Sequence, residues 1–117
     1  MPLDRESLLK AAAALPYIDV PVPELGDGAT VRLRMMSGVE RDKWDEFVTS
    51  KKDGSLKDAR PYLVGLCAVD ENGNRLFTDD DIASVNQLPG VTLEKLWNSA
   101  FKQNGLGADA VEEAAKN

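Results

Sequence analysis

The chain has 117 residues, of which 43% are apolar and 29% are charged, and its formal net charge is −6. This composition is ordinary for a folded protein, and the length suits one domain that withdraws about two thirds of its unfolded surface from water. The basic residues are scattered along the chain rather than clustered. Because a phosphate backbone repels an acidic surface, nucleic-acid binding is disfavoured and a protein partner is favoured.

Neither a membrane span nor a secretion signal is predicted. The apolar run at residues 62–69 is far shorter than the roughly 20 residues that cross a bilayer. Four charged residues interrupt the N-terminal segment: Asp4, Arg5, Glu6 and Lys10. A signal peptide requires an unbroken apolar stretch there, so we expect a cytoplasmic protein with no membrane partner. The single cysteine, Cys67, lies in an apolar run and should be buried, with no internal disulfide.

The first third of the chain predicts a helix followed by a β-hairpin. Asp4 is a candidate N-cap for a helix within residues 1–15. Apolar residues then alternate with polar residues or prolines on both sides of a Gly-Asp-Gly turn, which predicts a two-stranded hairpin over residues 17–36. Because Pro21 and Pro23 cannot donate ladder hydrogen bonds, the first strand should lie at a sheet edge.

Helical signals dominate residues 37–104. Ser37 and Glu40 form a capping-box pattern that opens one helix. Further helix caps are predicted at Asp58, Thr78 and Thr92. The predicted fold class is therefore α+β and helix-dominated, with the N-terminal hairpin packed on four to five short helices in a single globular domain of residues 1–104. Residues 105–117 are expected to form a flexible C-terminal tail.

The segment of residues 70–81 has the spacing of a calcium-binding loop but lacks two of its requirements. Oxygen-bearing side chains occupy loop positions 1, 3, 5 and 12: Asp70, Asn72, Asn74 and Asp81. Position 6, which needs a glycine for the sharp turn, is Arg75, and position 12 has an aspartate where a longer glutamate binds bidentately. Asn72-Gly73 instead favours a type I′ hairpin turn. We expect a structural turn with no metal.

Catalysis is disfavoured by the residues that are missing. The chain has no histidine, so the usual general base near neutral pH is absent. No glycine-rich phosphate loop follows a predicted strand and opens a helix. Adjacent carboxylates such as Asp79 and Asp80 suit a solvated helix end. We therefore predict no catalytic residues, no cofactor and no enzymatic activity.

Aromatic residues lie on the apolar faces of two predicted helices: Trp44, Phe47, Trp97 and Phe101. Core packing is the expected role of such residues, but a short chain with several amphipathic helices can leave part of one face for a partner. Trp44 and Met36, next to the predicted edge strand, are the candidates for an exposed partner-binding surface. The sequence alone does not separate the two roles.

The order of these motifs over residues 16–117 resembles the tail assembly chaperones of long-tailed bacteriophages with flexible, non-contractile tails. In that family a strand runs into a helix start like SGVERDKW of residues 37–44, and a helix ends in a turn like DENGNRLFTDDD of residues 70–81. A further helix like that of residues 93–106 follows. The final residues 112–117, EEAAKN, are also typical of the family.

The resemblance implies a binding protein of phage tail morphogenesis. Such chaperones bind the helical tape-measure protein in the host cytoplasm and keep it soluble. They help recruit tail-tube subunits through a longer frameshifted form, and they self-associate into curved assemblies. They are absent from the mature virion. The Lys-Asn end is compatible with a slippery A-rich codon run. The sequence leaves two alternatives open: a structural head–tail connector or tail-completion protein, and a calcium-responsive regulator.

Overall fold

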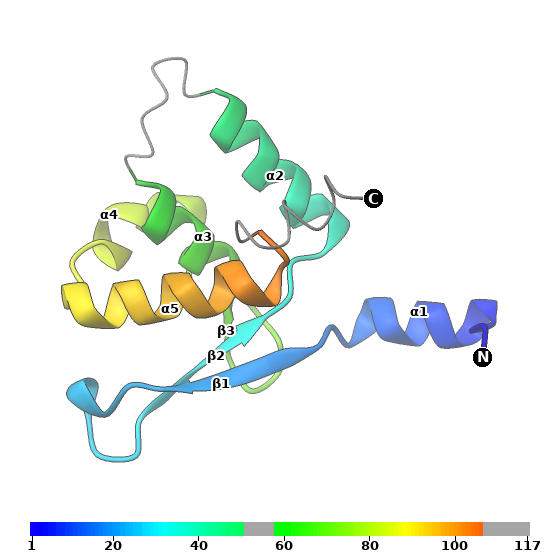
Figure 1. The fold of residues 1–117 in the computed structure, drawn as a ribbon, viewed down its shortest axis with the longest axis horizontal. Helices are drawn as coiled ribbons and strands as arrows, with labels where there is room; N and C mark the ends of the chain where they lie inside the picture. The colour runs from blue at the N-terminus through cyan, green and yellow to red at the C-terminus, as the bar shows by residue number, and fades with distance from the viewer. Residues whose placement is uncertain (51–57, 107–117) are drawn as a thin grey trace, which may run out of the picture.

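The computed structural model describes residues 1–50 and 58–106. Their helices and strands follow in chain order: α1 (Arg5–Ala13), β1 (Tyr17–Pro21), the 3-10 helix η1 (Pro23–Leu25), β2 (Thr30–Arg34), α2 (Gly38–Thr49), α3 (Ala59–Cys67), β3 (Ala68–Val69), the 3-10 helix η2 (Asp79–Asp81), α4 (Ile82–Val85) and α5 (Gly90–Gln103). The α+β, helix-dominated fold predicted from the sequence is confirmed (Figure 1). Within these residues, no helix has the length and hydropathy needed to span a bilayer.

The three strands form one antiparallel sheet in the order β1-β2-β3. The predicted hairpin pairs Tyr17 with Arg34 at one end and Pro21 with Thr30 at the other, and β1 lies at an edge as its prolines require. The strand β3 continues directly from α3 and leads into the predicted hairpin turn at Asn72-Gly73, but the sequence did not predict that its two residues pair with β2. A strand of two residues has no detectable alternation, so its periodicity cannot reveal it.

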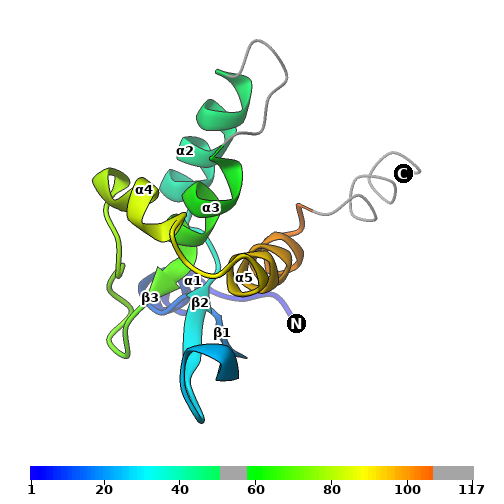
Figure 2. The same ribbon diagram turned by 90° about the vertical axis from the view of Figure 1, so that its left-hand side faces the viewer.

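Helices α3 and α5 pack against each other and against β2, with α2 and α4 beside α3 (Figures 1 and 2). Large side chains from these elements are fully buried at the centre of the molecule: Leu33, Leu63, Leu66, Val85 and Leu96. Cys67 is buried as predicted. Because Leu33 faces this core, its strand neighbours Arg32 and Arg34 point to the opposite face of the sheet.

Helix α1 extends away from this core as an arm (Figure 1). The predicted cap is present, since Asp4 Oδ1 accepts a hydrogen bond from the Ser7 N–H at 2.8 Å. Residues 1–14 are all exposed, so the predicted helix forms without contributing to the core.

The predicted helix caps are confirmed at Ser37 and Thr78 but not at Asp58 and Thr92. Ser37 and Glu40 form the expected reciprocal box at the start of α2. Asp58 precedes α3 in a left-handed conformation, with φ 66° and no side-chain cap bond. Thr92 is not a cap, because α5 begins at Gly90 and the Thr92 hydroxyl donates instead to Glu24, 2.7 Å away.

The C-terminal end of α5 follows the glycine rule for helix termination. Gly105 has a φ of 68°, and its N–H donates to the carbonyl of Lys102. The Leu106 N–H donates to the carbonyl of Phe101 at 2.9 Å, which completes a Schellman motif. Most of the tail predicted from residue 105 onward lies outside the described residues, so that prediction stays untested.

Candidate protein-binding surface

Five of the seven aromatic residues in the chain form one cluster where α2, α3 and α5 meet. Phe47 and Tyr62 stack with ring centroids 4.4 Å apart and an interplanar angle of 9°. Trp97 and Phe101 lie 4.8 Å apart one turn along α5. Trp44 joins the two pairs, 6.0 Å from both Phe47 and Trp97. The cluster therefore spans three helices that are separate in sequence.

The aromatic residues that reach the surface of this cluster differ from the one that the sequence predicted to be exposed. Trp44 is only 6% exposed, so its predicted exposure is wrong, and Met36 is half-buried against the core. Trp44 is buried because the Ser37 cap sets the start of α2, which turns the face of residues 40 and 44 inward. The other four aromatic side chains of the cluster are half-buried: Phe47, Tyr62, Trp97 and Phe101.

Sequence reasoning placed these aromatic residues on apolar faces but gave no signal for which would reach the surface. Trp97 and Phe101 are spaced by four positions on α5, next to the fully buried Leu96 and Ala100. On α5 the row of Leu96 and Ala100 lies in the core, and the adjacent row of Trp97 and Phe101 lies at the edge of the core. Only the packing of α3 against α5 decides which row is buried.

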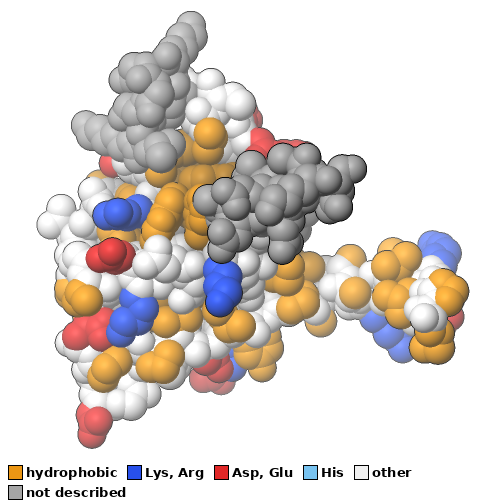
Figure 3. Space-filling model, in the orientation of Figure 1, with side chains coloured by type: hydrophobic (Ala, Val, Ile, Leu, Met, Phe, Trp, Pro, Cys, Tyr) orange, Lys and Arg blue, Asp and Glu red, His pale blue; other side chains and the backbone are white. Residues whose placement is uncertain are grey.

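Two shallow hollows flank the start of α3 beside the cluster. One, of about 310 Å³, is lined by residues that include Pro61 and Trp97. The other, of about 350 Å³, is lined by Tyr62 and Phe47 together with Lys43 and the carboxylate of Asp79. Hydrophobic side chains gather on this face of the molecule between α2 and α5 (Figure 3). Aromatic side chains with a charged rim suit the apolar stripe of a partner helix.

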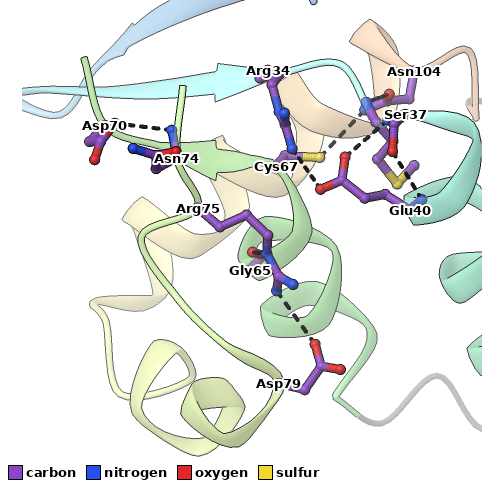
Figure 4. Close-up of polar contacts among 11 residues, drawn as sticks. Arg34, Ser37, Glu40, Gly65, Cys67, Asp70, Asn74, Arg75, Asp79 and Asn104 are labelled. Carbon is purple, nitrogen blue, oxygen red and sulfur yellow. Dashed lines mark hydrogen bonds and ion pairs between the residues drawn. The ribbon is translucent and has the colours of Figure 1, made fainter. Parts of the chain in front are cut away.

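A polar network holds the α2 and α5 sides of this surface in register (Figure 4). The Arg34 guanidinium donates to Glu40 Oε2 at 2.6 Å, and Glu40 Oε1 accepts from the Ser37 N–H at 2.9 Å. At the end of α5, Asn104 Oδ1 accepts from the Met36 N–H at 2.8 Å. All of these hydrogen bonds are made within the turn that joins β2 to α2 or directly beside it. The network therefore fixes the position of the start of α2 relative to the end of α5.

Asn104 also contacts the single cysteine. Its amide nitrogen donates to the Ala100 carbonyl at 2.8 Å and lies 3.6 Å from Cys67 Sγ. Burial raises the pKa of the Cys67 thiol to about 12. A thiol with that pKa carries almost no thiolate at neutral pH, so Cys67 acts as a packed apolar side chain and not as a nucleophile.

The segment that resembles a calcium loop forms a turn, in which its polar side chains have structural partners. Asp70 Oδ1 accepts from the N–H groups of Asn72 and Asn74, at 2.8 and 3.0 Å. The expected two-residue type I′ turn is wrong in detail. The Gly73 N–H donates to the Asp70 carbonyl, and only Gly73 has positive φ, at 83°. This is a three-residue hairpin loop that ends in a left-handed glycine.

Arg75, at the position where a calcium loop needs glycine, contributes to the packing of this turn (Figure 4). Its Nε donates to the Gly65 carbonyl of α3 at 3.1 Å, and its guanidinium lies 3.5 Å from Asp79. Asp81 Oδ2 accepts from the Thr78 N–H at 2.8 Å at the start of η2. Across residues 1–50 and 58–106, no group of three or more acidic or cysteine side chains is placed to hold a metal ion.

A scan against protein-family models and a search of curated proteins found no match. A search of solved structures found the tail assembly chaperone of bacteriophage HK97, with a TM-score of 0.61 and 24% sequence identity. The match covers 83% of this chain and 96% of that chain. This chain has the fold of a phage tail assembly chaperone. The likeness agrees with the sequence resemblance, and it extends over nearly the whole of the chaperone's chain rather than over one supersecondary motif.

Proposed function

We propose that this protein is a tail assembly chaperone of a long-tailed phage or prophage, which binds the tape-measure protein and keeps it soluble during tail morphogenesis. The observation that carries the proposal is the structural likeness to the HK97 tail assembly chaperone over 96% of that chain. The sequence motifs of residues 37–44 and 70–81 support it independently, since their residue patterns resemble those of the same family.

The aromatic cluster of α2, α3 and α5 is the proposed client surface. A tape measure is a long helical protein, so its unassembled form exposes apolar stripes that aggregate in water. Half-buried Trp97 and Tyr62 offer apolar area at low cost in side-chain entropy, because the core already holds them in place. Aromatic anchors of this kind dominate binding energy at protein interfaces. The net charge of −6 favours the solubility of this chain.

The same proposal includes three further features of such chaperones. The chain self-associates, a longer frameshifted form recruits tail-tube subunits, and both forms act in the host cytoplasm without entering the mature virion. The role requires no cofactor and no catalysis, because shielding an apolar client needs only surface. Reading the gene tests the frameshift: a slippery run with an overlapping downstream frame is expected near the codons for residues 112–117.

Co-expression with the tape-measure gene of the same phage tests the function. The proposal predicts that the tape-measure protein is recovered in the soluble fraction and co-purifies with this chain. A tape measure that stays insoluble and does not co-purify would contradict it.

A structural head–tail connector or tail-completion protein is the alternative, and mass spectrometry of purified virions separates the two. A chaperone is expected to be absent or present in traces, whereas a connector is present at fixed stoichiometry.

A further inference from the structure

We propose that Asn72 is a site of spontaneous deamidation in the folded protein, and that the fold protects Asn104 from the same reaction. The dipeptide Asn-Gly, in which deamidation is most favoured chemically, occurs at residues 72–73 and again at residues 104–105. The reaction needs only the chain itself and water, so it does not depend on the proposed function.

Deamidation begins when the backbone nitrogen of the following residue attacks the side chain of the asparagine. At Asn72 the Gly73 nitrogen bonds to Cγ, and the bond from Cγ to Nδ2 breaks. Nδ2 leaves as ammonia, which takes up the proton of the Gly73 N–H, and a cyclic imide remains. Water then opens this ring at either of its carbonyl carbons. The product is an aspartyl or an isoaspartyl residue, with one further negative charge in both cases.

Glycine is the following residue that most favours ring closure. It has no Cβ in the path of the attack, and its backbone rotates freely. A Cβ added at Gly73 or at Gly105 would meet no atom within 4 Å, so neither position is shielded by its surroundings. The other asparagines of the described residues precede residues that have side chains: Asn74, Asn86 and Asn98. Two candidates remain, and their structural surroundings separate them.

Asn72 lies in an exposed loop, and its side chain is free to rotate. Within the described residues its backbone N–H donates to Asp70 Oδ1, but its side-chain amide makes no hydrogen bond. The attacking nitrogen is held by one bond, from the Gly73 N–H to the Asp70 carbonyl at 3.0 Å. A single exposed loop bond opens at low cost in free energy. The Gly73 nitrogen is therefore readily available for attack.

Asn104 is held at both ends of its amide group. Its Oδ1 accepts from the Met36 N–H and its Nδ2 donates to the Ala100 carbonyl, each at 2.8 Å. The Gly105 N–H donates to the Lys102 carbonyl at 3.1 Å. Ring closure must break all three bonds, which detaches the end of α5 from the turn that leads into α2. Such an opening costs far more free energy than the release of one loop bond.

Deamidation of Asn72 should loosen the hairpin that follows β3. The loop is closed by Asp70 Oδ1, which accepts from the N–H groups of Asn72 and Asn74 at 2.8 and 3.0 Å. An isoaspartyl residue adds one carbon atom to the backbone between these two N–H groups, so both bonds cannot keep their geometry. The loop also sets the register of Arg75, which bridges to Val69. We expect the aged chain to lose protection from hydrogen exchange in this hairpin.

Peptide mass spectrometry of the wild-type chain, aged in mildly alkaline buffer, measures both sites in one sample. Trypsin places them in different peptides, of residues 58–75 and 103–116, and fragment ions distinguish Asn72 from Asn74. A parallel sample in guanidinium chloride gives the rate of each site in the unfolded chain. The ratio of the unfolded to the folded rate is the protection that the fold provides.

This protection is expected to be at least tenfold greater at Asn104 than at Asn72. Equal protection of the two sites, or greater protection of Asn72, would overturn the proposal. It would equally be overturned if Asn72 stayed intact in the folded chain while both sites reacted in guanidinium chloride.

Isoelectric focusing of aged variants gives an independent test. The folded wild type should gain a more acidic band, which Asn72→Gln should form at least tenfold more slowly, because a glutamine side chain closes the ring much less readily. Asn98→Gln, at an exposed position of α5, is the matched control and should age like the wild type. Circular dichroism shows whether both variants are folded. An acidic band that appears in folded Asn72→Gln as fast as in the wild type would refute the assignment to Asn72.

Discussion

The side-chain oxygen of Asn104 accepts a hydrogen bond from the backbone N–H of Met36, 68 positions earlier in the chain and 2.8 Å away. The same side chain donates to the Ala100 carbonyl at the end of α5. One amide group therefore satisfies both the turn that leads into α2 and the C-terminal end of α5. Because these helices carry most of the aromatic cluster, this relationship positions the proposed client surface.

Asn104→Ala should lower the free energy of unfolding by about 1–3 kcal/mol, because it leaves the Met36 N–H without its partner. Urea unfolding followed by tryptophan fluorescence measures the change. Asn98→Ala, at an exposed position of the same helix, is the control and should be within about 0.5 kcal/mol of the wild type. Equal effects of the two substitutions would show that the Asn104 network contributes nothing.

Glu40→Ala should destabilise the fold by about 2–4 kcal/mol, because it leaves the Arg34 guanidinium unpaired where only 21% of its side chain is exposed. It also removes half of the capping box of α2. Asp45→Ala breaks the exposed Arg41–Asp45 pair on the same helix and should cost less than about 1 kcal/mol. Chemical denaturation of both variants checks the contrast. The account of the network would be wrong if Asp45→Ala were the more damaging change.

Glu24 should make stability depend on pH in the acid range. The Thr92 hydroxyl, the backbone N–H of Glu24 and the Lys95 ammonium lower the pKa of Glu24 from 4.5 to about 2. A carboxyl with a depressed folded-state pKa contributes stability that is fully present above pH 4.5 and is lost as the pH falls toward 2.

In Glu24→Gln the free energy of unfolding should therefore fall less steeply between these two pH values than in the wild type. Glu94→Gln, at an exposed position of α5, is the control. Parallel pH profiles of the wild type and Glu24→Gln would contradict the linkage.

Gly73→Ala should cost about 1–2 kcal/mol, because Gly73 has a φ of 83° and an L-residue is strained in that region. No neighbouring atom lies within 4 Å of the added methyl, so the cost is conformational rather than steric. Gly90→Ala adds the same methyl in open space at the start of α5 and should be neutral or stabilising by up to about 1 kcal/mol. Thermal unfolding of the pair separates the two effects. A stabilised Gly73→Ala would disprove the assigned turn.

Trp97→Gln should weaken binding to the tape measure at least tenfold, because it removes a half-exposed aromatic anchor from the centre of the proposed client surface. Val91→Gln, 62% exposed on the same helix, should bind like the wild type. Pull-down with tape-measure fragments measures affinity, and a parallel urea titration confirms that both variants are folded under the assay conditions. Unchanged binding by folded Trp97→Gln would move the client site elsewhere on the molecule.

Signals that are local in sequence predicted the fold well. The capping box of Ser37 and Glu40, the Asp4 cap and the edge position of β1 all follow from residues within a few positions of one another. The features that the sequence missed depend on distant partners. Thr92 matches a cap in its own neighbourhood, but its hydroxyl meets Glu24, 68 positions away.

The candidate surface was predicted less well for the same reason. Trp44 and Trp97 both lie on apolar helix faces, and the packing of α2 and α5 around α3 buries the first and leaves the second half-exposed. The apolar periodicity of one helix cannot show which tryptophan is buried. It gives the direction in which a helix face points and not the distance of each side chain from the surface. The arm could not be recognised either, since Leu8 and Leu9 have the same spacing as core residues.

Dilution of denatured, purified tape-measure protein into buffer with this chain tests the central claim most directly. Light scattering and the soluble fraction after centrifugation are measured against the ratio of the two proteins. The account predicts that wild-type chain suppresses aggregation saturably and that an equal amount of Trp97→Gln does not. Aggregation that proceeds at the same rate with and without the wild-type chain would contradict it.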